Sequence, residues 1–239
     1  MALTVVGDRE AFTRDLEGKR VVISAGGTHE PLDPVRYLGN ASSGRQGFAL
    51  AEVAAQRGAQ VTLVAGVTDS LPTPIGAQVV RVKSARQMQH AVMEHATSAD
   101  VVVMAAAVAD YRPAEVAESK MKKGSEADLS TIKLTENPDI LAGVVEARRR
   151  GDVASTTKIV GFAAETGDEN STPLDFARKK LQKKGCDLLM CNAVGEGKVF
   201  GQPNSSGWIL RPNGTVTEVP EGPKTRVAAA IWKAVCETS

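Results

Sequence analysis

Short apolar runs alternate with segments of helical periodicity along this chain of 239 residues, and few folds accept that alternation. Uninterrupted apolar runs are typical of strands that are buried on both faces. Strands that alternate with helices form parallel, doubly wound sheets. The expected strands are residues 21–24, 61–65, 78–82, 100–106, 158–164 and 187–191, and the expected helices are residues 48–57, 84–96, 138–150, 172–185 and 223–237. The predicted fold class is therefore α/β, with a doubly wound, mostly parallel, Rossmann-like sheet.

Two segments are expected outside that sheet. After Arg112 the pattern loosens into a lysine-rich loop, which a short strand at residues 130–134 follows. Residues 208–210 and 215–219 flank a Pro-Asn-Gly turn and are expected to form a hairpin. Because an isolated hairpin is only marginally stable in water, it is expected to pack on the lysine-rich insertion or on a second subunit.

Small residues gather where two of the expected strands end. One segment runs from Ser24–Thr28 to Asn40–Gly47, and the other follows the strand that begins near Val101. Backbone without bulky side chains lets a ligand approach closely, and a helix N-terminus at a strand end attracts phosphate. The sequence therefore predicts a nucleotide site, although Gly39–Arg45 fails the P-loop pattern and Gly26–Thr28 fails the dinucleotide pattern.

The helix expected near Gly44 allows two interpretations. Ser42 and Ser43 can cap it, while Gly44 and Gly47 let an anion approach the free backbone amides. The alternative is an ordinary capped helix of a β–α unit that binds no ligand. Asn40 lies just before this helix; it could donate to a carboxylate or an acyl oxyanion, or it could be a turn-forming asparagine.

Lysines near these segments are the candidate phosphate ligands. Lys120, Lys122 and Lys123 follow the second small-residue segment and form either a flap over a triphosphate or a solvated charged loop. Lys180 and Lys184 are four residues apart, so they share one face of a helix. Like charges on one face are mildly unfavourable unless an anion lies between them.

Three further residues lie at expected strand ends, where ligands of open α/β sheets bind. Asp110 could meet a sugar hydroxyl, a base amine or a hydrated metal, or serve as a turn or capping residue. Phe162 could pack on a base or ribose, or belong to the core. Asn192 ends the sixth strand at the same edge. Asn137 is expected as the N-cap of the following helix, ahead of Pro138.

Composition excludes several classes of protein. The formal net charge of +1 argues against nucleic-acid binding by bulk charge. The chain has no apolar run of membrane-spanning length and no signal-peptide core at its N-terminus. Its three cysteines form no even disulfide framework and are expected as reduced thiols in the cytoplasm.

Taken together, these segments resemble phosphopantothenoylcysteine synthetase, the second activity of the bifunctional bacterial coenzyme A biosynthesis protein. The resemblance covers residues 19–232 in the order of that family. Its matching segments are residues 24–37 (SAGGTHEPLDPVRY), 40–44 (NASSG), 106–112 (AAVADYR), 120–123 (KMKK), 137–140 (NPDI) and 161–166 (GFAAET).

The resemblance implies a domain organisation and a reaction. Residues 19–239 would form the synthetase domain, and residues 1–18 resemble the linker after a flavin-dependent decarboxylase domain to which the native protein could be fused. That domain is absent, so no flavin is expected in this chain. The implied reaction joins phosphopantothenate to L-cysteine through an acyl-cytidylate, with CTP as co-substrate and Mg²⁺ accompanying the triphosphate. A homodimer is also implied, with the lysine-loop strand and the late hairpin at its interface.

The resemblance also assigns roles by position. Lys120 and Asn40 are the implied catalytic residues, Lys120 at the α-phosphate and Asn40 at the acyl group. The implied nucleotide-binding residues are Gly26, Gly27, Ser42, Gly44, Gly47, Ala106, Asp110, Lys120, Asn137, Pro138, Asp139, Ile140, Phe162, Lys180, Lys184 and Asn192. Those implied for phosphopantothenate and the acyl-cytidylate are Asn40, Ala106, Ala107, Asp110 and, more weakly, Arg36. No metal-binding side chain is assigned.

Two other functions remain open on the residues alone. An NAD(P)-dependent oxidoreductase of the Rossmann type also has glycine-rich strand ends, but the second strand ends in Ala65–Gly66 without an acidic residue, and neither tyrosine has a lysine four residues later. A nucleotide-binding module without catalysis is the other alternative.

Overall fold

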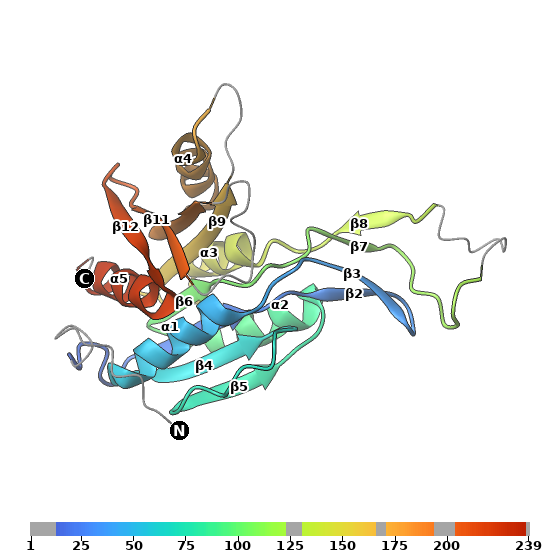
Figure 1. Cartoon of the computed structure of the whole chain (residues 1–239), viewed down its shortest axis with the longest axis horizontal. Coiled ribbons are helices and arrows are strands. Elements are labelled where there is room, and N and C mark those ends of the chain that lie inside the picture. The colour runs from blue at the N-terminus through green and yellow to red at the C-terminus, as the bar shows by residue number, and fades with distance from the viewer. Residues whose placement is uncertain (1–12, 123–130, 166–170, 194–203, 238–239) are drawn as a thin grey trace.

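The structure is a computed structural model that describes residues 13–122, 131–165, 171–193 and 204–237 (Figure 1). Its helices are α1 (Arg45–Gln56), α2 (Ala85–Ala96), α3 (Ile140–Arg150), α4 (Pro173–Lys184) and α5 (Lys224–Glu237). Its strands are β1 (Arg20–Ala25), β2 (His29–Asp33), β3 (Arg36–Gly39), β4 (Gln60–Ala65), β5 (Ala77–Arg81), β6 (Val101–Met104), β7 (Tyr111–Pro113), β8 (Leu134–Glu136), β9 (Lys158–Glu165), β10 (Leu188–Ala193), β11 (Asn204–Leu210) and β12 (Val216–Pro223).

Eight strands form one central sheet in the order β12-β11-β10-β9-β6-β1-β4-β5. The six strands from β10 to β5 are parallel, with β1 between β6 and β4. The apolar runs of β1 and β6 therefore lie inside the sheet, which explains why they lack polar alternation. The predicted α/β fold with a mostly parallel sheet is confirmed.

The late hairpin belongs to this sheet, so the expectation that it lies outside was wrong. β11 pairs antiparallel with β10, and β12 pairs antiparallel with β11. Gly207 lies so close to β10 that an added Cβ would stand 2.0 Å from the carbonyl oxygen of Cys191. A hairpin motif predicts its own turn but not the strand beside it, and here that strand completes the edge of the sheet.

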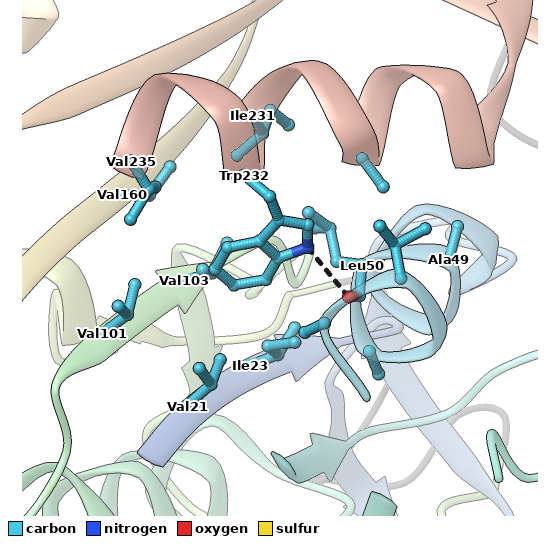
Figure 2. Packing of buried hydrophobic residues seen from close by; sticks show 14 of the residues in the cluster. Val21, Ile23, Ala49, Leu50, Val101, Val103, Val160, Ile231, Trp232 and Val235 are labelled. Carbon is cyan, nitrogen blue, oxygen red and sulfur yellow. Dashed lines mark hydrogen bonds between the residues drawn. The ribbon is translucent and has the colours of Figure 1, made fainter. Parts of the chain in front are cut away.

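Helices cover both faces of the sheet, because alternate residues of each strand point to opposite sides. On one face, α1 and α5 pack with Ile23 and Val103 in one apolar cluster. On the other face, α2, α3 and α4 pack with Val22 and Val102 in a second cluster. Figure 2 shows the first cluster, in which Trp232 is fully buried and its indole Nε1 donates to the Leu50 carbonyl at 3.0 Å.

Residues 13–18 pack against the sheet domain. Leu16 is buried in the first apolar cluster, and the Asp15 carboxylate accepts hydrogen bonds from the buried guanidinium of Arg57. Burial of Arg57 without a partner would leave an uncompensated charge. Residues 1–12 of the expected linker lie outside the described residues, and the boundary at residue 18 stays a prediction.

Two small hairpins extend from the carboxyl edge of the sheet and form an arm (Figure 1). β2 pairs with β3, and β7 pairs with β8. β8 is the short strand expected at residues 130–134, but it begins at Leu134; Ser130 lies outside the described residues. The β2–β3 hairpin was not predicted, because Pro31 and Pro34 mark this stretch as a loop. No helix of the described residues is long and apolar enough to cross a membrane.

Trp232 anchors α5, and its truncation measures that contribution. Trp232→Phe removes the hydrogen bond to Leu50 and part of the buried volume, and we expect it to lower the free energy of unfolding by about 1–2 kcal/mol. Urea unfolding followed by circular dichroism is the measurement. Ile75→Ala is the control, since that side chain is 86% exposed and its loss should cost under about 0.5 kcal/mol. Equal effects of the two variants would contradict the packing described.

Candidate functional site

The carboxyl ends of β1 and β6 continue into two backbone segments that bond to each other. The Ala107 N–H donates to the Gly26 carbonyl at 2.8 Å, and Gly27 forms a parallel bridge with Ala107. The Gly27 N–H donates to the Val67 carbonyl at 2.9 Å, on the side of β4. Three strand ends thus meet through backbone groups at the edge where open α/β sheets bind ligands.

Two buried hydroxyl groups bind the backbone of this edge from inside the domain. Neither residue was identified from the sequence as part of the site. Ser24 Oγ accepts from the Ala106 N–H at 3.2 Å, and Thr28 Oγ1 accepts from the Ala109 N–H at 2.9 Å. Ser24 and Thr28 are 0% exposed. Their signal in the sequence was a polar residue inside or directly after an apolar run, which fits any strand end and therefore does not single out a site.

Asn40 lies beside the same segment. Its amide Nδ2 donates to the Val108 carbonyl at 3.1 Å, and an added Cβ on Gly27 would stand 2.6 Å from the Asn40 carbonyl oxygen. The structure therefore brings Asn40 close to Gly27 and to the segment after β6. The Asn40 side chain is exposed, so it is accessible to a ligand at this edge.

Asn137 binds the end of the segment that follows β6, at residues 109 and 110, instead of capping a helix. Its side-chain Nδ2 donates to the Ala109 carbonyl at 2.8 Å, and its backbone N–H donates to the Asp110 carbonyl at 2.7 Å. The N-cap of α3 is Asp139, whose carboxylate accepts from the Ala142 N–H. The predicted N-cap was therefore wrong by two residues, because the tertiary bonds to residues 109 and 110 bind Asn137. Asp110 itself is exposed.

The N-terminus of α1 points to the edge with no side-chain cap at its first position. Gly44 is the N-cap residue, with a φ of 75° that glycine adopts readily. Ser42 Oγ accepts only from the Gly44 N–H, at 3.4 Å, so neither serine caps the helix proper. An added Cβ on Gly44 would meet Thr68, and one on Gly47 would stand 2.4 Å from Ala25 Cβ. Gly47 therefore serves close packing of α1 on β1, and access for an anion at this helix end stays a prediction.

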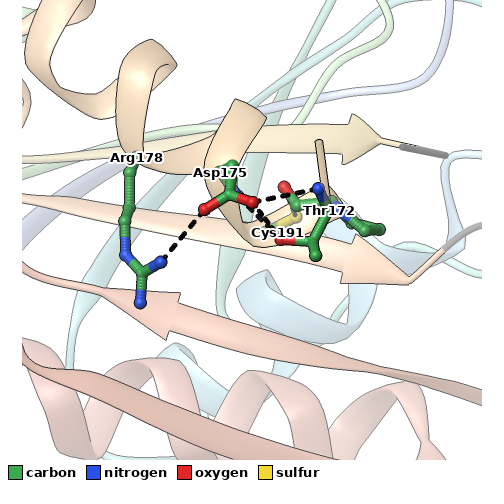
Figure 3. Close-up of polar contacts among 5 residues, drawn as sticks. Thr172, Asp175, Arg178 and Cys191 are labelled. Carbon is green, nitrogen blue, oxygen red and sulfur yellow. Dashed lines mark hydrogen bonds and ion pairs between the residues drawn. The ribbon is translucent and has the colours of Figure 1, made fainter. Parts of the chain in front are cut away.

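The lysines of α4 lie on the face of the sheet opposite α1. A capping box fixes the start of α4 (Figure 3), where Thr172 and Asp175 exchange hydrogen bonds and Arg178 pairs with Asp175. From the other end of α4, Lys184 forms an ion pair with Asp139 at the start of α3.

This ion pair affects the pKa of the Asp139 carboxyl. Burial would raise the pKa of the Asp139 carboxyl, but the hydrogen bonds from Lys184 and the Ala142 N–H outweigh burial and lower that pKa. Asp139 thus joins the start of α3 to α4, and Lys184 has a carboxylate partner.

Phe162 and Asn192 lie at the ends of β9 and β10. The Phe162 ring is half-buried and packs against the apolar cluster between α1, α5 and the sheet, and its contact with a nucleotide stays a prediction. Asn192 is half-buried, and among the described residues its Oδ1 atom is a buried acceptor without a hydrogen-bond donor. Since α4 covers the other face, the structure does not place Phe162 on the same side of the sheet as Lys180 and Lys184.

Lys120 and Arg36 belong to the arm. Lys120 is exposed on the segment that follows β7; Lys123 lies outside the described residues. Arg36 forms an ion pair with Asp33 and donates to the Met121 carbonyl at 2.6 Å. Asp33 was not singled out in the sequence, where it reads as an ordinary turn residue next to proline.

An open cavity of about 1340 Å³ lies between the end of β4, β5 and α2. Thr68, Arg81 and His90 are among its lining residues. None of the predicted site residues lines it, but the cavity borders the glycine-rich edge, because Val67, which accepts from the Gly27 N–H, is also part of its lining. The described residues contain no group of three histidine, cysteine, aspartate or glutamate side chains that could hold a metal ion.

Comparison with known proteins gives a consistent result. Residues 16–238 match the family described as the DNA/pantothenate metabolism flavoprotein C-terminal domain. The chain is 53% identical over 235 residues to the coenzyme A biosynthesis bifunctional protein CoaBC of Mycobacterium tuberculosis, covering 98% of this chain and 56% of that protein. It is 42% identical over 236 residues to CoaBC of Vibrio vulnificus, again covering 98% of this chain and 56% of that protein. The chain thus spans little more than half the length of these relatives.

Solved structures share the fold. The crystal structure of the C-terminal domain of CoaBC superposes with a TM-score of 0.76 at 35% identity, covering 95% of this chain and 98% of that chain. A Cab2 mutant in complex with phosphopantothenate-cysteine superposes with a TM-score of 0.71 at 18% identity, covering 94% of this chain and 87% of that chain.

Glycine at position 27 is required by the close approach at the edge, and its replacement tests that geometry. Gly27→Ala places a methyl group 2.6 Å from the Asn40 carbonyl oxygen, and overpacking of this kind costs about 1–3 kcal/mol of unfolding free energy. Gly143→Ala is the matched control: it lies inside α3 with nothing within 4 Å, so we expect a gain of about 0.5–1 kcal/mol. Thermal and urea unfolding measure both; a neutral Gly27→Ala would show that the edge is loosely packed.

Proposed function

This chain belongs to the family of the DNA/pantothenate metabolism flavoprotein C-terminal domain, and we propose that it is a CTP-dependent phosphopantothenoylcysteine synthetase of coenzyme A biosynthesis. The observation that carries the proposal is the 53% identity to the bifunctional protein CoaBC over 98% of this chain. Three of the segments that carry the family resemblance meet at one edge of the sheet, where Gly27 contacts both Asn40 and Ala107. The flavin-dependent decarboxylase that CoaBC relatives are proposed to carry would lie outside this chain.

The proposed reaction has two steps. In the first, a carboxylate oxygen of phosphopantothenate attacks the α-phosphorus of CTP, the bond from that phosphorus to the bridging oxygen breaks, and pyrophosphate leaves. In the second, the amine of L-cysteine attacks the acyl carbon of the acyl-cytidylate, loses a proton, and expels CMP. The thiol of the product comes from the substrate, so none of the three cysteines of the chain acts as a nucleophile.

The edge supplies the groups that such a reaction needs. The first turn of α1, which no side chain caps at Gly44, presents backbone N–H groups and the positive end of a helix dipole to a phosphate. The Ala106 and Ala107 backbone would line the acyl-cytidylate, and the exposed amide of Asn40 would orient its acyl oxygen. Lys120 would neutralise charge at the α-phosphate, with Lys180 and Lys184 further along the nucleotide.

Mg²⁺ would enter with the triphosphate. The ligands of this ion would be mainly phosphate oxygens and water. Mg²⁺ would supply charge neutralisation on the leaving pyrophosphate. A cytoplasmic location for the chain stays a prediction.

A homodimer through the arm is part of the proposal. Six of the seven large apolar side chains that the described residues expose lie on the arm: Val35, Tyr37, Leu38, Tyr111, Val116 and Leu134. Apolar groups gathered on one projecting element are typical of an interaction surface. The proposed homodimer buries this surface. It would bring residues 120–122 of one copy, the lysine segment, toward its partner.

Pyrophosphate release tests the reaction. We expect release from CTP to require phosphopantothenate and to continue only when L-cysteine is present, with CMP formed in equal amount. ATP in place of CTP should support little release. Coupled phosphate detection and liquid chromatography of the nucleotides are the measurements. Release without phosphopantothenate would indicate a nucleotide hydrolase, and no release with either nucleotide would refute the proposed synthetase.

Sedimentation velocity tests the dimer. We expect the wild-type chain to sediment at twice its monomer mass of 25.1 kDa. Val116→Glu, which places a charge on the arm, should raise the dimer dissociation constant by about tenfold or more. Ile75→Glu is the matched control, because Ile75 is the exposed apolar residue off the arm. A monomeric wild type, or equal dissociation by both variants, would contradict the proposed interface.

A further inference from the structure

Asp33 is a buried carboxylate that the proposed reaction does not use. Its side chain is 0% exposed, although it lies on a hairpin that projects from the sheet. One carboxylate oxygen, Oδ1, accepts from the backbone N–H groups of Val35 and Arg36, both at 2.9 Å. The other, Oδ2, accepts from the Met121 N–H at 3.2 Å and pairs with the Arg36 guanidinium at 2.9 Å. The two oxygens therefore do different work: Oδ1 closes the β2–β3 turn, and Oδ2 binds the lysine segment.

Arg36 completes the grip on Met121. Its Nη2 atom donates to the Met121 carbonyl at 2.6 Å, so both backbone groups of Met121 are bound by the Asp33–Arg36 pair. A further backbone hydrogen bond, from the Ala117 N–H to the Leu32 carbonyl at 3.0 Å, joins the segment that follows β7 to the β2–β3 hairpin. Figure 1 shows the two hairpins side by side along the arm. Met121 lies between Lys120 and Lys122, so this pair fixes the backbone of the lysine segment.

The β2–β3 hairpin is itself bound to the body of the domain. Buried Glu30 accepts from the Ala85 N–H at 2.8 Å, at the first residue of α2. The His29 N–H donates to the Lys83 carbonyl at 2.8 Å, and the rings of His29 and Tyr37 stack at 3.6 Å. A continuous set of contacts therefore runs from the core through the hairpin to Met121.

We propose that Asp33 is a positioning residue, which acts through Arg36 and the Met121 backbone to hold Lys120 in the orientation that phosphoryl chemistry requires. The inference rests on the proposed function of Lys120. A lysine has four rotatable bonds, and on a loop without anchors its ammonium group would occupy the productive position only a small part of the time. Fixing the adjacent peptide removes the backbone part of that freedom before the substrate binds.

The charge of Asp33 is part of this role. Burial raises the pKa of the Asp33 carboxyl, but three backbone hydrogen bonds and the Arg36 charge outweigh it and hold that pKa below its ordinary value. The carboxylate is therefore ionised at neutral pH. Asparagine has the same shape but only one acceptor oxygen, so if that oxygen keeps the turn, the amide NH₂ faces the Met121 N–H and Arg36.

Limited trypsin digestion tests the grip without reference to activity. Trypsin cleaves after Lys120 only when the Met121 peptide leaves Asp33 and Arg36, so cleavage reports the open fraction of this segment. We expect Asp33→Asn to speed cleavage at Lys120–Met121 by about tenfold or more, measured by mass spectrometry of early fragments. Cleavage after Lys158, inside the sheet, should not change.

Two variants keep this test decisive. Asp152→Asn alters an exposed aspartate that pairs with Arg150 at the end of α3, outside the contacts that lead to Met121, and it should leave cleavage after Lys120 within about twofold of wild type. Arg36→Gln removes the second half of the grip and should speed cleavage even where Asp33→Asn folds poorly. Unchanged cleavage in Asp33→Asn and Arg36→Gln would overturn the proposal, whether or not the chain makes phosphopantothenoylcysteine.

A double-mutant cycle separates positioning from a general structural effect. Lys120→Gln should lower the rate of CTP-dependent pyrophosphate release by about 10²–10³-fold, and Asp33→Asn alone by about tenfold or more. If Asp33 acts through Lys120, Asp33→Asn should cost nothing further in the Lys120→Gln background. Asp152→Asn should keep the wild-type rate. Full additivity of the two losses would refute a positioning role and leave Asp33 with a structural one.

Discussion

The close approach of two backbone segments at Gly27 is the constraint on which the rest of this edge depends. Gly27 bonds to Val67 on one side, bridges Ala107 on the other, and leaves no room for a Cβ below the Asn40 carbonyl. Because Gly27 has no side chain, the Asn40 backbone can approach it closely. The ends of β1 and β4 can meet because Gly26 and Gly66 also lack side chains: an added Cβ would stand 2.6 Å from the Val67 carbonyl oxygen at Gly26 and 2.3 Å from the Gly27 carbonyl oxygen at Gly66. Asn40 and the Ala106–Ala107 backbone take their positions from these close contacts.

Exposed backbone at such an edge is stable only if its polar groups find partners. Ser24 and Thr28 satisfy two N–H groups of the segment after β6 from inside the domain, and Asn137 binds its far end. These bonds are made within the protein, so the edge is already in place before any ligand arrives. Preorganisation of this kind suits binding through backbone groups, because little conformational entropy is lost when the ligand binds.

Local patterns in the sequence predicted the parallel sheet, its helices and the position of the edge, because each of these follows from periodicity and from small residues at strand ends. Long-range partners were the part that local patterns could not give. The place of the late hairpin depends on β10, and the roles of Asn137 and Asp33 depend on residues 28 and 88 positions away in the chain. In each case the residue type suited a local role, as a cap or a turn, and tertiary contacts gave it another.

The family assignment and the structure answer different questions about this chain. Identity over nearly the whole chain indicates which chemistry to propose and leaves no observation in favour of the oxidoreductase alternative, but it does not say how the groups are held. The structure places the backbone edge in the sheet and the lysine segment on an arm, two regions that no shared secondary-structure element fixes relative to each other. A rigid arm would therefore serve the proposed chemistry, and buried Asp33 with half-buried Arg36 would provide that rigidity at Met121, where the two side chains bind both backbone groups.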